Sequence, residues 1–364
     1  MRRNFFIIAA FALIMALPAL DSIFHFSPVK DLFEKRLPVE KPTHPQNFSQ
    51  VLEYPKNFEK FFDDNYGFRK SFVSLNSKIM DKVFDESPDA RAVVGKDGWF
   101  YFDNHNSLLD AVGKATLSDE LVERGVEVFA KNWREMRAKN IDYLLVIAAD
   151  KATIYPEFLP DYLQAAPPHQ IDKFLTALKK KYPDFPVLDL RPILLAAKKN
   201  EILYHKTDTH WNRRGAHYGY VEIAKKLGIK ANLRDKFKNK EDGFFRGDIS
   251  DIMGVETQNV DYDLKEKFPI NITQIQPTPT EKSRFHKPFF FQNGDKNLPV
   301  IFVYKDSYFA NLFDFISTHF SRSYYVNEFP CNLDYQRFAG YKPNIVIQEF
   351  WEGRIEVVLN SCKN

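Results

Sequence analysis

Apolar residues follow two repeating patterns along most of this chain. Short continuous apolar runs predict strands that are buried on both faces, whereas apolar stripes at helical spacing predict helices with one buried face. The predicted strands are 142–149, 186–190, 298–304 and 344–350, and the predicted helices between them include 118–139, 171–181, 214–227 and 308–320. Buried strands that alternate with helices indicate a parallel sheet covered by helices on both faces. The body of the chain is therefore predicted to be an α/β domain.

The same patterns divide the chain into segments. We expect the α/β domain to span residues 91–354, and we interpret the charged stretch 232–294, rich in Asn, Asp and Pro, as an insertion of loops and short strands. Residues 355–364 are expected to form a C-terminal tail. Residues 28–90 combine a proline-punctuated linker with a helical region at 58–84. The apolar side chains of that helical region are spaced for a buried stripe and are expected in the core, namely Phe61, Phe62, Phe68, Phe72, Leu75 and Ile79.

Residues 1–27 have the form of an export signal. Arg2 and Arg3 precede an apolar run at 5–20, which is the arrangement of a secretory signal peptide or of an uncleaved signal anchor. The run is close to the lower limit of about 17 residues for a membrane-spanning helix. Because residues 16–20 contain no clean small-x-small cleavage site, the anchor is the favoured interpretation. Either interpretation places the body of the chain outside the cytoplasm.

Composition narrows the function classes. The chain has 364 residues, enough for a large core, and its formal net charge is only +3 without a compact basic stripe, so we expect no nucleic-acid partner. It has no glycine-rich phosphate loop and no cysteine spacing typical of a metal site, so no cofactor is expected. The two cysteines, Cys331 and Cys362, leave two alternatives open: one disulfide in an oxidising compartment, or two unpaired thiols.

Two polar motifs carry candidate chemistry. The hexapeptide 207–212 holds Asp208 and His210, whose side chains point to the same side of an extended backbone because they are two positions apart. The carboxylate can then accept a hydrogen bond from Nδ1 and leave Nε2 free. Farther along the chain, Ser307 follows a predicted strand and begins a predicted helix, at the carboxyl end of a parallel strand where ligands collect. Together these residues are the parts of a Ser-His-Asp acyl-transfer site.

Each motif also has a simpler interpretation. His210 alone is typical of a hydrogen-bonded surface histidine, and Ser307 alone is typical of a helix cap. Metal binding is the competing chemistry, with candidate ligands Asp208, His210, His205 and His217. We expect no metal, because Lys206 and Trp211 are unsuitable neighbours for a cation.

Four segments of the chain resemble the motifs of AlgJ/AlgX-type polysaccharide O-acetyltransferases, a family with an SGNH-hydrolase-like fold. Residues 208–212 (Asp-Thr-His-Trp-Asn) and 306–308 (Asp-Ser-Tyr) are the first two. Residues 95–101 match a Gly-x-Asp-Gly-Trp turn, and residues 151–157 match a Lys-x-x-x-Tyr-Pro-Glu stretch after a central strand. The resemblance extends over about residues 91–354.

The resemblance implies a role for each residue of the two polar motifs. Ser307 would be the nucleophile, His210 the general base and Asp208 the carboxylate that orients His210. The serine would accept an acetyl group and pass it to a hydroxyl of an exopolysaccharide, such as alginate, in the periplasm, without a metal or nucleotide cofactor. A membrane-bound O-acyltransferase would supply the acetyl group. The N-terminal segment would anchor the protein to the inner membrane, or direct its export if the signal is cleaved.

Three further residues are weaker candidates for contacts with the polysaccharide, namely Lys206, Tyr308 and Lys151. The simpler interpretations are a solvated lysine for Lys206 and a packed aromatic ring for Tyr308. The sequence assigns no second oxyanion donor beside the N–H of Ser307.

Two other functions stay open on the sequence alone. A carbohydrate acetylesterase would form the same acetyl-enzyme and resolve it with water. A non-catalytic envelope scaffold that binds glycan is the second alternative, because Lys305 stands where the family usually has glycine before Asp-Ser. Transfer and hydrolysis differ in water exclusion and acceptor binding rather than in the triad, so the motifs do not distinguish them.

Overall fold

The computed structural model describes residues 2–24, 26–27, 39–80, 89, 91–232, 238–240, 247–253, 255, 263–265 and 272–362. The chain forms two compact units, residues 1–94 with 248–257 and residues 95–247 with 258–364. All three residues of the predicted triad belong to the second, larger unit.

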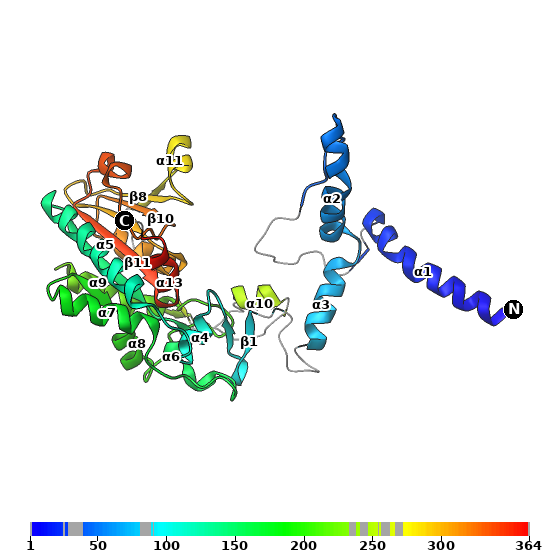
Figure 1. The fold of residues 1–364 in the computed structure, drawn as a ribbon, viewed down its shortest axis with the longest axis horizontal. Helices are drawn as coiled ribbons and strands as arrows, with labels where there is room; N and C mark the ends of the chain where they lie inside the picture. The colour runs from blue at the N-terminus through cyan, green and yellow to red at the C-terminus, as the bar shows by residue number, and fades with distance from the viewer. Residues whose placement is uncertain are drawn as a thin grey trace. The chain divides into compact units, whose positions relative to one another are not determined.

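The larger unit is built on a central β-sheet (Figure 1). Within the described part of the chain, its strand order is β4-β3-β11-β9-β10-β8-β7. The strands are β3 (Asp142–Ala148), β4 (Val187–Asp189), β7 (Ile272–Ile275), β8 (Phe289–Asn293), β9 (Val300–Tyr304), β10 (Arg322–Val326) and β11 (Ile345–Trp351). Neighbours from β4 to β10 run parallel, whereas β8 runs antiparallel to β10 and β7 antiparallel to β8. The predicted parallel sheet is therefore confirmed, with an antiparallel pair added at one edge.

The added strands come from the segment that was interpreted as an insertion. β7 and β8 both lie within residues 232–294, so this part of the segment extends the sheet. The segment also contributes β5 (Lys238–Lys240) and β6 (Asp263–Lys265), which pair with each other. β8 buries Phe290 in the core, whereas no residue of the edge strand β7 is fully buried. An edge strand with polar residues at its centre, here Thr273 and Gln274, lacks the continuous apolar run by which the inner strands are recognised.

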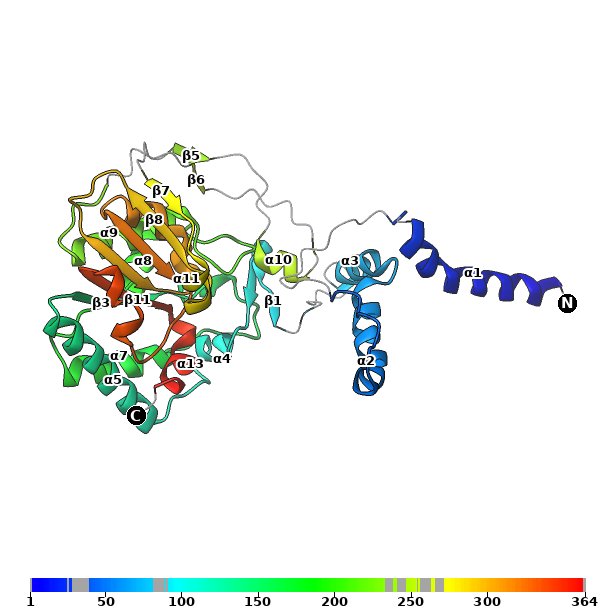
Figure 2. The same ribbon diagram turned by 90° about the horizontal axis from the view of Figure 1, so that it is seen from above.

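Helices cover both faces of this sheet (Figure 2). On one face, α5 (Asp119–Ala138), α7 (Gln170–Lys181) and α13 (Ile355–Asn360) contact one another and bury apolar side chains against the strands. On the other face, α9 (Arg213–Lys226) contacts both α8 (Arg191–Ala197) and α12 (Phe313–Ser317). The unit also contains α4 (Ser107–Ala111), β2 (Phe100–Phe102), α6 (Lys151–Ile154) and α11 (Pro279–Arg284). The central strands are apolar because they are covered on both sides: every residue of β11 is buried.

The described part of the predicted C-terminal tail, residues 355–362, begins with a helix that packs in the core. Residues 355–360 are helix α13, and its side chains Ile355, Val358 and Leu359 lie in the core beside α5. A helix of this length has too few turns to display a repeating apolar stripe in the sequence.

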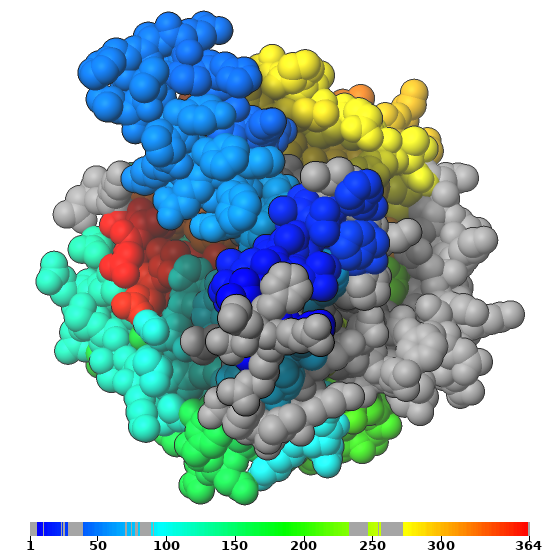
Figure 3. Space-filling model, turned by 90° about the vertical axis from the view of Figure 1, so that its right-hand side faces the viewer, coloured from blue at the N-terminus to red at the C-terminus, as the bar shows by residue number. Residues whose placement is uncertain are grey.

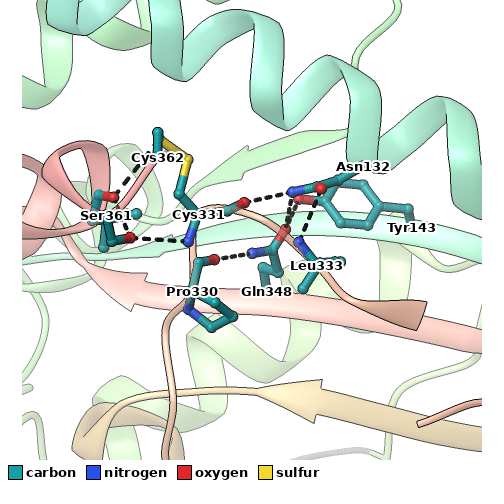
Figure 4. The surroundings of a disulfide bond; sticks show 9 residues. Asn132, Tyr143, Pro330, Cys331, Leu333, Gln348, Ser361 and Cys362 are labelled. Atoms are coloured by element: carbon teal, nitrogen blue, oxygen red, sulfur yellow. Dashed lines mark hydrogen bonds between the residues drawn. A yellow bond between two sulfur atoms is a disulfide. The ribbon is translucent and has the colours of Figure 1, made fainter. Parts of the chain in front are cut away.

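A disulfide joins Cys331 to Cys362 and so settles the alternative that the sequence left open (Figure 4). It links the loop after β10 to the end of α13. The loop is also held by Asn132 of α5, whose Nδ2 donates to the carbonyl of Cys331 at 2.7 Å and whose Oδ1 accepts the N–H of Leu333 at 3.1 Å. Gln348 of β11 donates to the carbonyl of Pro330 at 2.7 Å. The covalent link and these buried amides fix the chain between β10 and β11.

The smaller unit contains α1 (Arg2–Phe24), α2 (Phe48–Asn65), α3 (Arg69–Ile79), β1 (Ala92–Val94) and α10 (Asp248–Met253). The helix predicted over 58–84 is interrupted between α2 and α3, where Phe68 has a positive φ of 62°. Residues 81–84 of that prediction lie outside the described residues. The surface of α2 and α3 is the lighter blue region of Figure 3.

The buried stripe predicted for this helical region is wrong. Phe62, Phe72, Leu75 and Ile79 are all exposed, with Phe62 at 54% and Leu75 at 55%. None of the residues of α2 is buried, so the apolar face of this helix is not part of a core. Helical spacing alone does not reveal whether a second layer exists.

Over the described residues, no helix is both long enough and apolar enough to span a membrane. The signal anchor expected in residues 1–27 and its alternative, an export signal in the same segment, both stay predictions.

Candidate active site

The structure brings the three predicted triad residues into one hydrogen-bonded chain. His210 Nδ1 lies 2.6 Å from Asp208 Oδ1, and the backbone N–H of His210 donates to the same oxygen at 2.9 Å. On the other side of the ring, His210 Nε2 lies 2.7 Å from Ser307 Oγ. Both distances are in the range at which a nucleophile, a base and an orienting carboxylate cooperate. The imidazole therefore connects a buried carboxylate to an exposed hydroxyl.

Asp208 and His210 lie on a loop between α8 and α9 that closes on itself. An isolated antiparallel bridge pairs Tyr204 with Trp211, and the N–H of Asn212 donates to the carbonyl of Leu203 at 2.8 Å. Asn212 then begins α9, because its side-chain oxygen accepts the first free N–H groups of the helix. The bridge turns the chain so that the carboxylate and the imidazole face each other.

Ser307 lies at the carboxyl end of β9, as the sequence predicts. The following turn is held by Asp306, whose carboxylate accepts the N–H of Tyr308 at 3.0 Å and that of Trp351 at 2.8 Å. The N–H of Asp306 donates to Glu349 Oε2 at 3.1 Å. Ser307 begins a 3₁₀ helix, Ser307–Leu312, that leads into α12, where the sequence predicted one continuous helix.

Tyr308 is a packed aromatic residue, which is the simpler of its two predicted interpretations. Its ring is only 5% exposed and lies between the rings of His210, at 4.9 Å, and Trp351, at 6.0 Å. Its hydroxyl donates to the carbonyl of Thr209 at 2.8 Å, and its own carbonyl accepts Trp211 Nε1–H at 2.9 Å. Tyr308 therefore joins two parts of the site. One is the turn at residues 306–308, called the serine turn below, and the other is the loop between α8 and α9 that holds Asp208 and His210, called the histidine loop.

Lys151, one of the candidates for a contact with the polysaccharide, is buried against backbone carbonyls. The residue is only 3% exposed, and its Nζ donates to the carbonyls of His205 at 3.1 Å, Lys206 at 2.9 Å and Asp208 at 2.7 Å. An ammonium group has three N–H donors, and the three carbonyls account for them. The contact with glycan that the sequence suggested for this residue stays a prediction, and the described contacts give Lys151 a structural role.

Lys206 bridges two of the segments that carry the family resemblance. Its Nζ donates to the carbonyl of Asp97 at 2.9 Å, and its carbonyl accepts the N–H of Phe100 at 2.8 Å. The side chain is half-buried at the surface, so a contact with glycan stays a prediction for this residue. The turn at 95–101 thus supports the histidine loop from outside.

Buried acids lie behind the site at the ends of β3 and β11. Asp150 accepts Trp351 Nε1–H at 2.7 Å, and its own N–H donates to Glu352 Oε1 at 2.6 Å. Burial raises the pKa of Asp150 to about 6 and that of Glu352 to about 8. Burial also raises the pKa of Glu349, next to Asp306, well above its usual range. Sequence reasoning missed this cluster, although acids directly after buried strands were a visible signal.

Lys305, the departure from the resembling family, points into an aromatic cluster. Its ammonium lies 5.6 Å from the ring centre of Phe289 and 5.2 Å from that of Phe313, within cation–π range. Its backbone N–H donates to the carbonyl of Val326 at 3.0 Å. Burial lowers the pKa of this lysine. The substitution is thus accommodated between β8 and α12, and the serine turn beside it keeps its hydrogen bonds.

Of the candidate metal ligands, His217 has partners of its own, and Asp208 and His210 lie together in the triad. His217 lies on α9, where its ring packs at 5.6 Å from Tyr220 and 5.5 Å from Phe315, and its Nε2 lies 3.4 Å from the carbonyl of Asn232. Asp208 and His210 face each other instead. The arrangement of these residues favours proton transfer through the imidazole.

Comparison with known proteins places this chain in a family. Residues 92–313 match the family described as "SGNH hydrolase-like domain, acetyltransferase AlgX". The chain is 27% identical to the "Probable alginate O-acetylase AlgJ" of Pseudomonas aeruginosa over 174 residues, which are 48% of this chain and 41% of that protein. It is 26% identical over 225 residues to the protein of the same name from Pseudomonas syringae, covering 58% and 55%. The matched region thus spans about half the length of these relatives.

Solved structures agree with the fold. The PatB1 protein of Bacillus cereus, solved with a sulfonyl adduct, superposes with a TM-score of 0.50 at 13% identity over 72% of this chain and 97% of that one. A DHHW family protein from Eubacterium siraeum gives a TM-score of 0.50 at 14% identity, covering 72% and 94%. At such identities the likeness concerns the fold alone, and it confirms the predicted fold class. The chain belongs to the AlgX-type acetyltransferase family with an SGNH hydrolase-like domain.

Proposed function

We propose that this protein is an O-acetyltransferase that carries an acetyl group on Ser307 and passes it to a hydroxyl of a polysaccharide. The observation that carries the proposal is the continuous chain from Asp208 Oδ1 through His210 to Ser307 Oγ, with contacts of 2.6 and 2.7 Å. Membership of an acetyltransferase family supports the same reaction class.

The first half of the reaction loads the serine. Ser307 Oγ attacks the carbonyl carbon of the acetyl donor while His210 Nε2 takes the hydroxyl proton. The tetrahedral adduct then collapses, the bond to the donor's leaving group breaks, and the imidazolium returns its proton to that group. Asp208 holds the imidazole with Nε2 toward the serine and stabilises the positive charge of the imidazolium. The backbone N–H of Ser307 is the candidate donor to the developing oxyanion.

The second half transfers the acetyl group. A sugar hydroxyl attacks the acetyl-enzyme, His210 takes its proton, and the new ester leaves as Ser307 regains its hydrogen. Water in place of the sugar would give an acetylesterase with identical residues. Transfer is favoured by the names of the relatives, which are called alginate O-acetylases, so we propose an exopolysaccharide such as alginate as the acceptor.

The setting of the reaction follows from two observations. The basic and apolar start of the chain has the form of an export signal, and a disulfide between Cys331 and Cys362 suits an oxidising compartment. We therefore place the reaction in the cell envelope, on the periplasmic side. By family resemblance, the acetyl group would be delivered by a membrane-bound O-acyltransferase.

The test is a transfer assay with purified protein. An activated acetyl ester such as p-nitrophenyl acetate is supplied with and without a de-acetylated acidic polysaccharide, and ester formation on the polysaccharide is measured beside acetate release. We expect acetylated polysaccharide from the wild type and none from Ser307→Ala. If acetate is released equally with and without the polysaccharide, and no ester forms on the polysaccharide, the protein is an esterase. If cells that make only Ser307→Ala still acetylate their glycan while deletion abolishes acetylation, the scaffold is the correct function.

A further inference from the structure

One buried cation holds the loop that carries the base. Lys151 is the first residue of α6, directly after the end of β3, and its ammonium meets the carbonyls of His205, Lys206 and Asp208 at 2.7–3.1 Å. We propose that Lys151 is a positioning residue for the proposed acetyl transfer: it fixes the histidine loop so that Asp208 meets His210 and His210 meets Ser307. The inference rests on the proposed function for its effect on activity.

Three carbonyl oxygens that converge on one buried point need a cation between them. Their partial negative charges repel one another, and burial denies them water as a substitute donor. Hydrogen bonds from an ionised donor are about twice as strong as neutral ones, so one ammonium can offset this repulsion. Without the ammonium, the most direct relief is an outward movement of the loop backbone at residues 205–208.

Two aromatic rings complete the surroundings of the ammonium. Nζ lies 5.6 Å from the ring centre of Trp99 and 5.4 Å from that of Tyr101, within the range of cation–π attraction. Both rings come from the turn at 95–101, while Lys151 comes from the stretch at 151–157. Three of the four segments that carry the family resemblance therefore meet at this one charge. The fourth segment, which contains Ser307, contacts the histidine loop through His210 Nε2.

The path from the ammonium to the hydroxyl is short. The carbonyl of Asp208 accepts from Lys151 at 2.7 Å, and the carboxylate of the same residue accepts from His210 Nδ1 at 2.6 Å. Any shift of the Asp208 backbone therefore moves the carboxylate and rotates the imidazole. We call the three contacts from Lys151 Nζ to the loop carbonyls the clamp. Since a misplacement of about 1 Å in a reacting group can cost about 10²-fold in rate, loss of the clamp should lower kcat far more than it raises KM.

The experiment compares Lys151→Met with a matched control, Lys173→Met, in the full-length protein. Lys173 also donates to a backbone carbonyl, that of Leu117 at 2.6 Å, but it lies on α7 and bonds no residue of the site. Two readouts are used: kcat and KM for p-nitrophenyl acetate, and the far-downfield proton resonance of the hydrogen between His210 Nδ1 and Asp208. In Lys151→Met we expect kcat to fall about 10²-fold with KM little changed, and the resonance to move or disappear. Lys173→Met should keep the wild-type kinetic constants and the wild-type resonance.

A second variant covers the case in which Lys151→Met does not fold. Lys151→Arg keeps the charge but replaces a compact ammonium by a broad planar fork that does not fit three convergent carbonyls. We expect a folded protein with a smaller loss of kcat, roughly tenfold, and the same displaced resonance. A folded Lys151→Met or Lys151→Arg with wild-type kcat and an unmoved resonance would overturn the positioning role.

The two readouts also separate this inference from the proposed function. If the wild type turns over no acyl ester and Lys151→Met nevertheless loses the resonance, the acetyl transfer is wrong and the clamp on the loop stands. If the wild type acts through Ser307 and Lys151→Met matches it in rate and resonance, the function stands and the clamp is wrong.

Discussion

The serine turn and the histidine loop, the two halves of the candidate site, are held in different ways. Ser307 follows β9 directly, and its turn is fixed by neighbours in the chain and by the adjacent strand β11, through Asp306. Asp208 and His210 lie on a connection between α8 and α9, and side chains from distant segments hold that connection. Lys151 and Tyr308 are the main ones.

The difference shows where this site is vulnerable. The place of the nucleophile is a consequence of sheet topology, which the close packing of the whole core maintains. The place of the base depends on a few hydrogen bonds to backbone carbonyls, each of which one substitution can remove. Changes to the residues that hold the histidine loop should therefore alter catalysis without unfolding the protein, whereas changes to the residues that hold the serine turn, such as Asp306, should affect both.

The largest effect is expected from removing the reacting groups themselves. Ser307→Ala and His210→Ala should each lower kcat for acetyl transfer by at least about 10⁴-fold, and the double variant should be no worse than the single ones because the residues act as a unit. Steady-state assays on protein with an unchanged melting temperature measure this. Additive losses in the double variant would mean that the two residues do not act in one step.

Asp306→Asn tests the claim that the serine turn couples activity to stability. The carboxylate accepts two N–H groups and lies 3.5 Å from Arg354 Nε, whereas an amide offers one acceptor oxygen. One buried N–H then loses its partner, so we expect a stability loss of about 1–3 kcal/mol together with a roughly tenfold or greater fall in kcat. Chemical denaturation and kinetics are compared on the same samples.

The matched control for this variant is Asp334→Asn. Asp334 caps another 3₁₀ helix, Tyr335–Arg337, by accepting the N–H of Gln336 at 3.0 Å, and this cap contact involves no residue of the triad. It should show a small loss of stability and wild-type kcat. Equal losses of activity in both variants would contradict a specific role for the turn at Ser307.

The buried acids behind the site predict a pH-dependent stability. Burial raises the pKa of Glu352 to about 8, so the folded protein binds this proton more tightly than the unfolded chain does. The protonated Glu352 carboxyl therefore stabilises the fold fully at acidic pH. As pH rises toward about 8, this contribution to the free energy of unfolding is lost at about 1.4 kcal/mol per pH unit. Glu352→Gln keeps an acceptor for the N–H of Asp150 and should flatten the dependence between about pH 5 and 8. Parallel curves for the two proteins in urea titrations would show that Glu352 is ionised in the fold.

The smallest effect is expected at Lys206, the outer support of the histidine loop. Lys206→Met removes one hydrogen bond to the carbonyl of Asp97 from a half-buried side chain, so kcat should fall by no more than about tenfold. The same variant examines the predicted contact with glycan. A KM that rises for an acidic polysaccharide but not for p-nitrophenyl acetate would support that contact. If the KM of the variant equals that of the wild type for both substrates, Lys206 only supports the histidine loop.

The fold was predictable where burial is continuous. The runs at 142–149, 298–304 and 344–350 correspond to β3, β9 and β11, the centre of the sheet. β10 was missed because Arg322 and Ser323 interrupt its apolar character. β7 and β8 lie in the segment 232–294, for which short strands were expected without stated bounds. The buried stripe expected at 58–84 failed for the opposite reason: amphipathic spacing was present, but the described unit has no layer to cover it.

The candidate site was predictable only as far as its chemistry is local in the chain. Asp208 and His210 are two residues apart, and Ser307 is marked by the strand that precedes it, so their types and positions indicated a triad. The role of Lys151 depends on carbonyls more than fifty residues away, and carbonyls are the same at every position of a sequence. Nothing in the residues around Lys151 could therefore distinguish a clamp from a ligand contact.

The most direct test of the account is to locate the acetyl group. The full-length protein is incubated with p-nitrophenyl acetate, quenched in acid, digested, and analysed by mass spectrometry beside Ser307→Ala. The account predicts one acetylated peptide, modified at Ser307 and missing from the variant, with slower labelling in His210→Ala. An acetyl group found on other residues, or folded protein that is never labelled although it turns over the ester, would contradict the serine acetyl-enzyme.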